Sequence, residues 1–140
     1  MHKDHAFQVL LVEPVNLLRR TVALTVRGLD TAEVTEAATY ANAYAACERR
    51  SFDAAVIAVE SPLSDEHHTG LNLVQQIRAG QCVCAASIPI AVLVESCNTE
   101  LLQLLRTCGI SRILIKPFRV RDVIDTIDAM RELAAAVGAR

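Results

Sequence analysis

Residues 54–62 read AAVIAVESP, and the first six of them, Ala54–Val59, are all apolar. A run this short and this apolar predicts a strand that is buried on both faces, as the central strands of a parallel sheet are. Pro62 ends the run, because proline lacks the N–H that a strand ladder needs. We therefore expect Ala54–Val59 to lie in the middle of a parallel sheet.

Short apolar runs alternate with amphipathic segments on both sides of this stretch. The other strands are expected at residues 7–12, 33–37, 88–94 and 112–115, and the helices at 17–27, 40–50, 70–80, 100–107 and from 120 onward. Five βα units in this order predict an α/β fold with a doubly wound, five-stranded parallel sheet. We expect residues 1–140 to form a single domain.

Several residues are expected to set the ends and the buried face of these helices. Thr39 and Thr99 are predicted to be helix N-caps, and Gly109 is predicted to end the fourth helix. In the last helix apolar residues recur at helical spacing, which predicts a buried stripe. Its members are Val120, Val123, Ile124, Ile127, Met130, Leu133, Ala134 and Val137.

Composition and charge exclude several kinds of function. The formal net charge of -2 gives no large basic field, so direct nucleic acid binding has no electrostatic support. No apolar run reaches the roughly 18–20 residues of a membrane span, and the N-terminal MHKDHAF has no apolar core of a secretory signal. The five cysteines are odd in number and irregularly spaced, as free thiols in a reducing compartment are. We therefore expect a cytoplasmic protein that does not contact the membrane.

In doubly wound sheets, ligands bind beyond the carboxyl ends of the strands. In this chain four places follow such ends: Glu13–Pro14, residues 58–62, Val94–Glu95 and Lys116–Pro117. The first two places carry Glu13 and Glu60, and the last carries Lys116. Any functional site is expected among these residues.

Four segments lie in the order found in one family of signalling domains: VLLVE (9–13), FDAAVIAVESP (52–62), IPIAVLV (88–94) and CGISRILIKPF (108–118). Together they resemble the response-regulator receiver domain, and the resemblance covers nearly the whole chain. It implies a flavodoxin-like (CheY-like) fold of the (βα)5 type. In that family two acids after the first strand and an Asp ending the third strand hold Mg²⁺, and this Asp accepts a phosphoryl group. A Ser or Thr after the fourth strand and a Lys after the fifth bind the phosphoryl oxygens.

The resemblance carries over to this chain with most of the reactive groups replaced. Lys116 matches the family lysine, and Pro117 matches the proline behind it, which is commonly cis. Pro62 matches the proline four residues beyond the acceptor, which puts Ala58 at the acceptor position. Glu13 matches the first acid, and the second is replaced by Pro14 or lost in a short deletion.

Both groups that normally respond to phosphorylation are also replaced. Val94 takes the place of the hydroxyl residue, and Ile113 takes the place of the aromatic residue that usually changes rotamer on activation. Mg²⁺ needs several oxygen ligands, usually carboxylates, and phosphoryl transfer depends on positioning and charge neutralisation around the metal. The residues therefore predict a degenerate phosphorylation pocket with weak or absent Mg²⁺ binding and no other cofactor.

Glu60 leaves alternatives open, because it follows Ala58 by two residues and would point to the same side of an extended segment. An ion pair between Glu60 and Lys116, with Glu13 nearby, would close the pocket without a metal, and this interpretation is preferred to a residual metal site. Glu60 or Asp65 could instead act as a displaced phosphoacceptor. The loop 61–69 could lie over the pocket as a lid, and its His67 and His68 are expected to be solvated.

Two further groups of residues allow a sensing or binding role. Cys82 and Cys84 are two residues apart and could be redox-active, although one thiol is expected to point inward and one outward, with structural packing as the preferred interpretation. Four arginines could form a basic patch along the fourth helix, fifth strand and fifth helix: Arg106, Arg112, Arg119 and Arg121. Such a patch would suit an acidic partner or a nucleotide.

Taken together, the residues predict a pseudo-receiver in two-component or phosphorelay signalling that acts through phosphorylation-independent protein binding. It is not expected to be an enzyme, because the sequence contains no GxSxG or GxGxxG motif and no credible Ser-His-Asp or Cys-His order. The expected partner is a histidine kinase, an output domain or another regulator, bound through the face formed by the fourth helix, fifth strand and fifth helix. A homodimer is a further alternative. So are a phosphorelay receiver with a displaced acceptor and a nucleotide- or redox-sensing module.

Overall fold

The computed structural model describes residues 6–60 and 69–138, and it contains five strands and five helices in strict alternation. The strands are β1 (Gln8–Val12), β2 (Glu33–Ala37), β3 (Ala54–Ala58), β4 (Ile90–Val94) and β5 (Arg112–Ile115). The helices are α1 (Asn16–Leu29), α2 (Tyr40–Arg49), α3 (Gly70–Arg78), α4 (Thr99–Thr107) and α5 (Val120–Gly138).

All neighbouring strands pair in parallel, in the order β2-β1-β3-β4-β5. This order reverses direction after β1, which makes the sheet doubly wound, and the predicted fold class is confirmed. β3 is the central strand, and all five of its residues are buried. The apolar run Ala54–Val59 therefore has the position that its composition predicts.

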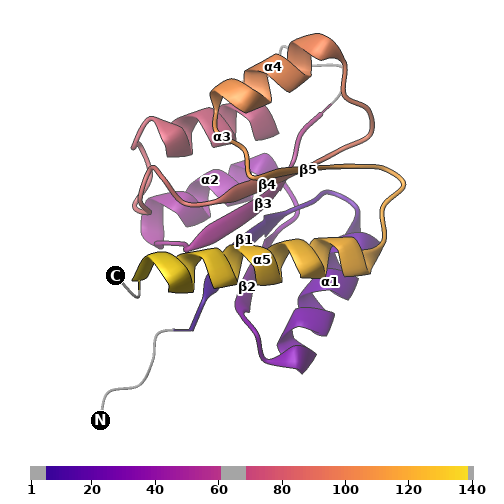
Figure 1. The fold of residues 1–140 in the computed structure, drawn as a ribbon, viewed down its shortest axis with the longest axis vertical. Coiled ribbons are helices and arrows are strands. Elements are labelled where there is room, and N and C mark those ends of the chain that lie inside the picture. Colours follow the sequence, from indigo (N-terminus) through magenta and orange to yellow (C-terminus); the bar gives the residue numbers. More distant parts are fainter. Residues whose placement is uncertain (1–5, 61–68, 139–140) are drawn as a thin grey trace.

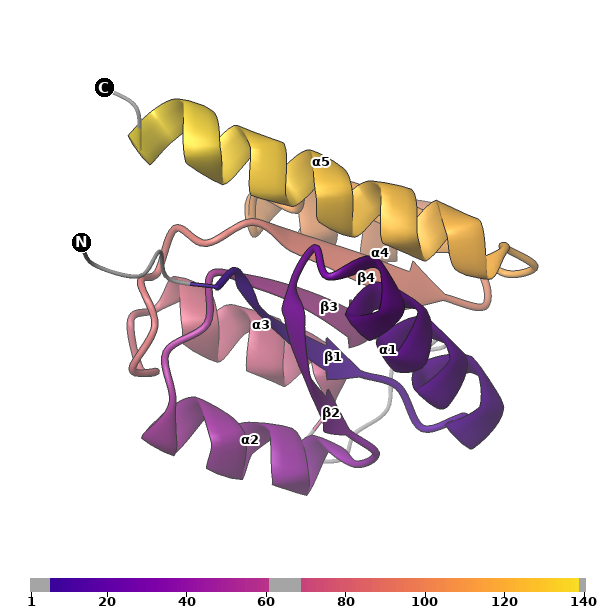
Figure 2. The ribbon, with the colours of Figure 1, turned by 90° about the horizontal axis from the view of Figure 1, so that it is seen from below.

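Helices cover both faces of the sheet (Figures 1 and 2). α1 and α5 lie on one face, where Val9, Leu11 and Val56 of the strands pack against Val22 of α1 and Ile127 of α5. α2, α3 and α4 cover the other face over a second apolar cluster. Because side chains alternate along each strand, successive residues of β3 and β4 contribute to opposite clusters.

Helix caps agree with the sequence at α2 and differ at α4. The Thr39 side chain accepts a hydrogen bond from the Asn42 N–H, so the predicted cap of α2 is confirmed. The cap of α4 is Asn98, whose side chain accepts from the Leu101 N–H at 2.8 Å, so the expectation of Thr99 was wrong by one residue. Gly109 has a φ of +66°, the left-handed conformation that ends helices, as expected.

The predicted buried stripe of α5 is only partly correct. Val123, Ile127 and Met130 are buried, but Leu133 is 56% exposed. The helix has 19 residues and rises about 1.5 Å per residue, whereas the strands have four or five residues at about 3.3 Å each. The last turns of α5 therefore extend beyond the strands, and Leu133 lies at a hollow beside Arg112, the first residue of β5.

Gly70, the first residue of α3, packs directly on the end of β3. A Cβ atom at this position would lie 2.0 Å from the carbonyl oxygen of Ala58, so only glycine allows this approach. The loop before it, residues 61–68, lies outside the described residues, and so do the expectations for Pro62, Asp65, His67 and His68. Among the described residues, no helix combines the length and apolar character needed to cross a bilayer.

Candidate functional site

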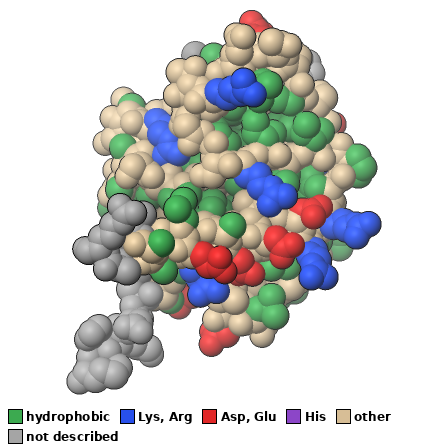
Figure 3. Space-filling view, in the orientation of Figure 1, with side chains coloured by type: hydrophobic (Ala, Val, Ile, Leu, Met, Phe, Trp, Pro, Cys, Tyr) green, Lys and Arg blue, Asp and Glu red, His purple; other side chains and the backbone are tan. Residues whose placement is uncertain are grey.

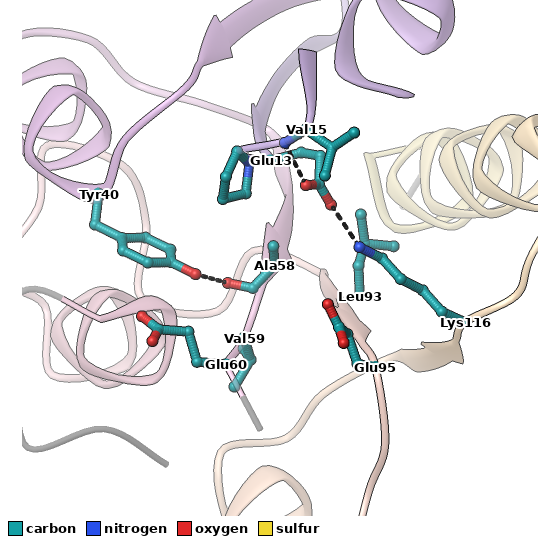
Figure 4. Close-up of a pocket in the computed structure, with 10 residues that line it drawn as sticks. Glu13, Val15, Tyr40, Ala58, Val59, Glu60, Leu93, Glu95 and Lys116 are labelled. Atoms are coloured by element: carbon teal, nitrogen blue, oxygen red, sulfur yellow. Dashed lines mark hydrogen bonds and ion pairs between the residues drawn. The ribbon is translucent and has the colours of Figure 1, made fainter. Parts of the chain in front are cut away.

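A cavity of about 370 Å³ opens at the carboxyl edge of the sheet. Figure 4 shows the side chains around it, which come from the ends of β1, β3, β4 and β5 and from the start of α2. The lining residues are Glu13, Pro14, Val15, Tyr40, Ala58, Val59, Glu60, Leu93, Glu95 and Lys116. Five of the residues predicted to form the pocket are therefore brought together here: Glu13, Pro14, Ala58, Glu60 and Lys116.

Glu13 is held rigidly at the end of β1, and its side chain is only 1% exposed. Its Oε2 accepts a hydrogen bond from the Val15 N–H at 2.8 Å. Its main-chain carbonyl accepts from the Arg19 guanidinium at 2.9 Å, and Arg19 is itself bound to Glu36 at 3.2 Å. This network on α1 and β2 supports the turn that carries Glu13, and the Val15 N–H orients its carboxylate.

Lys116 reaches the cavity from the end of β5. Its Nζ lies 4.0 Å from Oε1 of Glu13, an ion-pair contact that is too long for a direct hydrogen bond. Oε1 of Glu13 is buried without a hydrogen-bond partner. The peptide bond from Lys116 to Pro117 is cis, as the resemblance implies.

Ala58, at the expected acceptor position, offers only a methyl group and its main-chain carbonyl to the cavity. The hydroxyl of Tyr40 donates a hydrogen bond to this carbonyl at 2.9 Å. Gly70 covers the same carbonyl from the start of α3. The end of β3 is therefore closed by neighbours from two helices.

Glu60 lines the cavity but does not pair with Lys116. Among the described residues, the carboxylate in contact with Lys116 is that of Glu13. Figure 4 shows Glu60 on the opposite side of Ala58 from Lys116. The expected ion pair was wrong because β3 ends at Ala58, and beyond a strand end the two-residue alternation no longer fixes where a side chain points.

Three of the predicted pocket residues lie elsewhere. Val94 is 1% exposed and packs with Ile113 in the apolar cluster beneath α3 and α4. Leu93 and Glu95, its neighbours in sequence, line the cavity instead. Pro117 lines an adjoining hollow with Leu18 and Phe118, to which Glu95 and Lys116 also contribute.

The residues present do not fit the Mg²⁺ that the resemblance implies. Mg²⁺ requires octahedral oxygen ligands at about 2.0–2.1 Å. One oxygen of Glu13 is occupied by the Val15 N–H, the other faces the ammonium group of Lys116, and position 58 has no carboxylate. Within residues 6–60 and 69–138, no three His, Cys, Asp or Glu side chains are grouped so that they could hold a metal ion.

Tyr40 was not among the predicted site residues, because a functional site was expected only after the ends of four strands, and β2 was not one of them. Tyr40 begins α2, which starts at the same edge of the sheet as the other strand ends. The Thr39 cap marks this helix start in the sequence. The residue directly after this cap is Tyr40, so the cap is the sequence signal that indicates it.

The four arginines predicted as a patch are all exposed, but they do not form one cluster. Arg106 and Arg112 lie near the start of β5, and Arg119 and Arg121 follow its end. In Figure 3 some basic side chains on this face stand apart, and others lie among acidic side chains. Arg121 also pairs with Asp125 on its own helix at 3.9 Å.

The expectation for Cys82 and Cys84 was wrong in its geometry. Both thiols are associated with the core, and Val83 between them is 57% exposed. The expected inward and outward placement could not hold even in an extended segment, where residues i and i+2 share one side. Residues 82–84 form bends, and the packing of this loop places both thiols against the core. Cys47 of α2 lies in the same apolar cluster.

Comparison with known proteins supports the fold. No family model matches the sequence, and no curated protein is significantly similar to it. Among solved structures, the chain is similar to the signal receiver domain of a LuxO repressor protein from Vibrio parahaemolyticus (TM-score 0.78, 16% identity, 96% of this chain and 97% of that chain). It is also similar to a CheY-like receiver domain protein from Methanospirillum hungatei (TM-score 0.75, 17% identity, 91% and 95% covered). A third match is the chemotaxis protein CheY4 of Vibrio cholerae (TM-score 0.74, 24% identity, 90% and 99% covered). The order of the strands, the two helical layers and these similarities together show that the chain has the CheY-like fold of response-regulator receiver domains.

Proposed function

We propose that this protein is a pseudo-receiver: a cytoplasmic module of two-component signalling that binds a protein partner without being switched by aspartyl phosphate. The observation that carries the proposal is the chemistry at the end of β3. Ala58 has no group that can accept a phosphoryl group, and its carbonyl is occupied by the Tyr40 hydroxyl.

The contact between Lys116 and Glu13 supports the same proposal. In an active receiver the corresponding lysine binds phosphoryl oxygens, whereas here the Glu13 carboxylate faces the ammonium group at 4.0 Å. Val94 and Ile113 are apolar and packed together in the core, so neither offers a polar group that could respond to a phosphate. Among the described residues, the two positions that the resemblance assigns to this response therefore carry no group that could change state on phosphorylation.

We place the partner on the face formed by α4, β5 and α5. Ile115 of β5 is 51% exposed there, and Leu133 of α5 is also exposed. Arg112 and Arg119 bracket this apolar surface at the two ends of β5. Apolar groups flanked by arginine are typical of protein interfaces, and they would suit a histidine kinase, an output domain or another regulator.

The test is phosphorylation by a small donor, followed by mass and NMR. The wild-type chain and Ala58→Asp are each treated with Mg²⁺ and acetyl phosphate, and intact mass and two-dimensional amide spectra are recorded. The wild type should gain no phosphate and show an unchanged spectrum. Ala58→Asp should remain unswitched even if it is modified, because Val94 and Ile113 cannot transmit the change.

Two results would count against the proposal. One is a phosphate adduct on the wild type, and the other is a phosphate-dependent shift of amide signals on β5 and α4 in Ala58→Asp. A double variant, Ala58→Asp with Pro14→Asp, serves as the positive control for modification, because both positions line the cavity and the change restores the acceptor and a second acid. Modification of the double variant shows that the donor and the fold are competent in the assay.

A second candidate is a phosphorelay receiver with a displaced acceptor, and one observation favours it. Glu60 lines the cavity, which places a carboxylate within the site. If Glu60 is the acceptor, the wild type gains a phosphate adduct and Glu60→Gln does not. A phosphate adduct that persists in Glu60→Gln would show that Glu60 is not the phosphoacceptor.

A further inference from the structure

Three cysteine thiols meet between α2 and the loop that leads to β4. Cys47 lies near the end of α2 and is 1% exposed, while Cys84 is 4% exposed and Cys82 is partly buried. Cys82 packs against the apolar cluster that contains Cys47 and Cys84, and both of these thiols influence its pKa. All five cysteines of the chain are free. This cluster lies outside the cavity at the strand ends, because none of its members lines that cavity.

The main chains around Cys47 and Cys82 are joined side by side. The N–H of Val83 donates a hydrogen bond to the carbonyl oxygen of Cys47 at 3.1 Å. The residue next to Cys82 is therefore in direct main-chain contact with Cys47, and both cysteines pack against the same apolar cluster. A bridge between them would join two segments that already touch.

We propose that Cys47 and Cys82 are a thiol pair that hydrogen peroxide or a similar two-electron oxidant converts to a disulfide. A bridge from Cys82 to Cys84 is disfavoured, because only Val83 would separate the two cysteines and the short ring would strain the disulfide. Cys47 comes from a separate segment and imposes no such ring.

The chemistry follows from exposure. Cys82 is the more accessible thiol of the pair, so its thiolate is the one that attacks an oxygen atom of the peroxide. The O–O bond breaks, and the hydroxide that leaves takes up a proton to form water. The product is a sulfenic acid on Cys82. The sulfur of Cys47 then displaces its hydroxyl, forming the S–S bond and releasing a second water. Two thiols lose two electrons and two protons, and one peroxide is reduced to two waters.

The surroundings make this reaction slow at neutral pH. Desolvation by burial raises the pKa of Cys82, and it raises that of Cys47 to about 12. The titratable groups that face the pair are Tyr44, Cys84 and Glu48, and none of them carries a positive charge that would favour a thiolate. Disulfide formation should therefore be faster at mildly alkaline pH.

A bridge at this point would act on the helix that also lines the cavity. Tyr40, Tyr44 and Cys47 follow at i, i+4 and i+7, so they share one face of α2. Tyr40 bonds to Ala58 at one end of this face, and the thiols lie at the other. The bridge would tie the end of α2 to the loop before β4. This inference is independent of whether the cavity accepts phosphate.

The experiment is peroxide oxidation of the full reduced chain at mildly alkaline pH, followed by intact mass, thiol counting and non-reducing tryptic mapping. The wild type should lose two hydrogens and two titratable thiols while remaining monomeric. Residues 28–49 and 79–106 contain no internal Lys or Arg, so a bridged pair appears as these two peptides joined. The second peptide also contains Cys84 and Cys97, so variants are needed to assign the bridge.

Four variants make that assignment. Cys82→Ser and Cys47→Ala should abolish the joined peptides, and Cys84→Ser and Cys97→Ser should retain them. Cys82→Ser changes a partly exposed side chain, so it reports on the bridge even if Cys47→Ala fails to fold. The proposal is overturned if the wild type keeps all five thiols, if the joined peptides persist in Cys82→Ser, or if they disappear in Cys84→Ser instead.

Discussion

At the scale of single residues, the main-chain carbonyl of Ala58 is held by contacts from two helices. The Tyr40 hydroxyl bonds to it at 2.9 Å, and Gly70 packs against it from the start of α3. Tyr40 also lies against Gly70, since a Cβ there would be 3.2 Å from the tyrosine ring. Three elements therefore meet at one oxygen atom, and a small change at any of them should disturb the others.

Gly70→Ala is expected to destabilise the fold strongly. The new methyl group would overlap the Ala58 carbonyl oxygen at 2.0 Å. This oxygen belongs to the main chain of the last residue of the central strand, so it cannot move away easily. We expect the free energy of unfolding to fall by roughly 2–4 kcal/mol, as measured by urea denaturation.

Gly28→Ala is the matched control for this prediction. Gly28 lies in α1, and a Cβ there would meet nothing within 4 Å. Alanine is favoured over glycine in a helix by about 0.5–1 kcal/mol, so this variant should be slightly more stable than the wild type. Equal effects of the two substitutions would show that the close approach at Gly70 is not what the position requires.

At the scale of elements, two neighbouring residues at the start of α4 have different roles. Both are residue types that can cap a helix, so the sequence does not show which of them does. Asn98 caps the helix through its side chain, and Thr99 is the first helical residue. Asn98→Ala should therefore cost about 1 kcal/mol of unfolding free energy, because the Leu101 N–H loses its partner. Thr99→Ala should change the stability by less than about 0.5 kcal/mol.

Thermal unfolding of both variants, measured by circular dichroism, checks this prediction. A larger loss of stability in Thr99→Ala than in Asn98→Ala would assign the cap to the threonine. Thr39→Ala, at the confirmed cap of α2, provides a reference for how much a cap contributes in this fold, because its side chain accepts from the Asn42 N–H. Asn98→Ala and Thr39→Ala should lower the melting temperature by similar amounts.

At the scale of the whole molecule, the layer of α2, α3 and α4 is held together by apolar packing, and the side chain of Arg78 adds hydrogen bonds within it. The Arg78 guanidinium donates to the carbonyls of Cys108, Ala86 and Ile88 at 2.6–2.7 Å. It thereby ties α3 to the loop before β4 and to the end of α4. The thiol cluster lies in the same layer, so the ionisation of these thiols should affect the stability of the fold as a whole.

Stability should fall as the pH rises above about 9, provided that the protein is kept reduced. Burial raises the pKa of Cys47 from 9.0 to about 12, so between these values the unfolded chain releases a proton that the folded chain keeps. Unfolding is then favoured by rising pH, because the unfolded state binds fewer protons. Burial also raises the pKa of Cys82 and Cys84, which adds to the effect in the same direction.

Melting temperatures recorded from about pH 8 to about pH 10.5 with a phosphine reductant test this linkage. Cys47→Ala should lower the starting stability but flatten the decline with pH. Val74→Ala also removes buried apolar volume and carries no thiol, so it should lower the curve without changing its slope. An unchanged slope in Cys47→Ala would mean that Cys47 does not contribute to the pH dependence.

Much of the fold could be predicted because the signals are local. The apolar run at Ala54–Val59 requires a strand buried on both faces, and the alternation of strands and amphipathic helices requires a parallel sheet with helical layers. The positions of Glu13, Ala58 and Lys116 at one edge follow from the same argument, since parallel strands end together. These properties depend on residue type and spacing, so the sequence by itself determined them.

Only the tertiary structure decided which of these side chains contact one another. Glu60 is separated from Lys116, Val94 lies in the core beside Ile113, and Tyr40 closes the end of β3. Each of these outcomes depends on where a strand ends or on how a helix packs against the sheet. Such contacts join segments that are distant in sequence, and no periodicity or spacing along the chain encodes them.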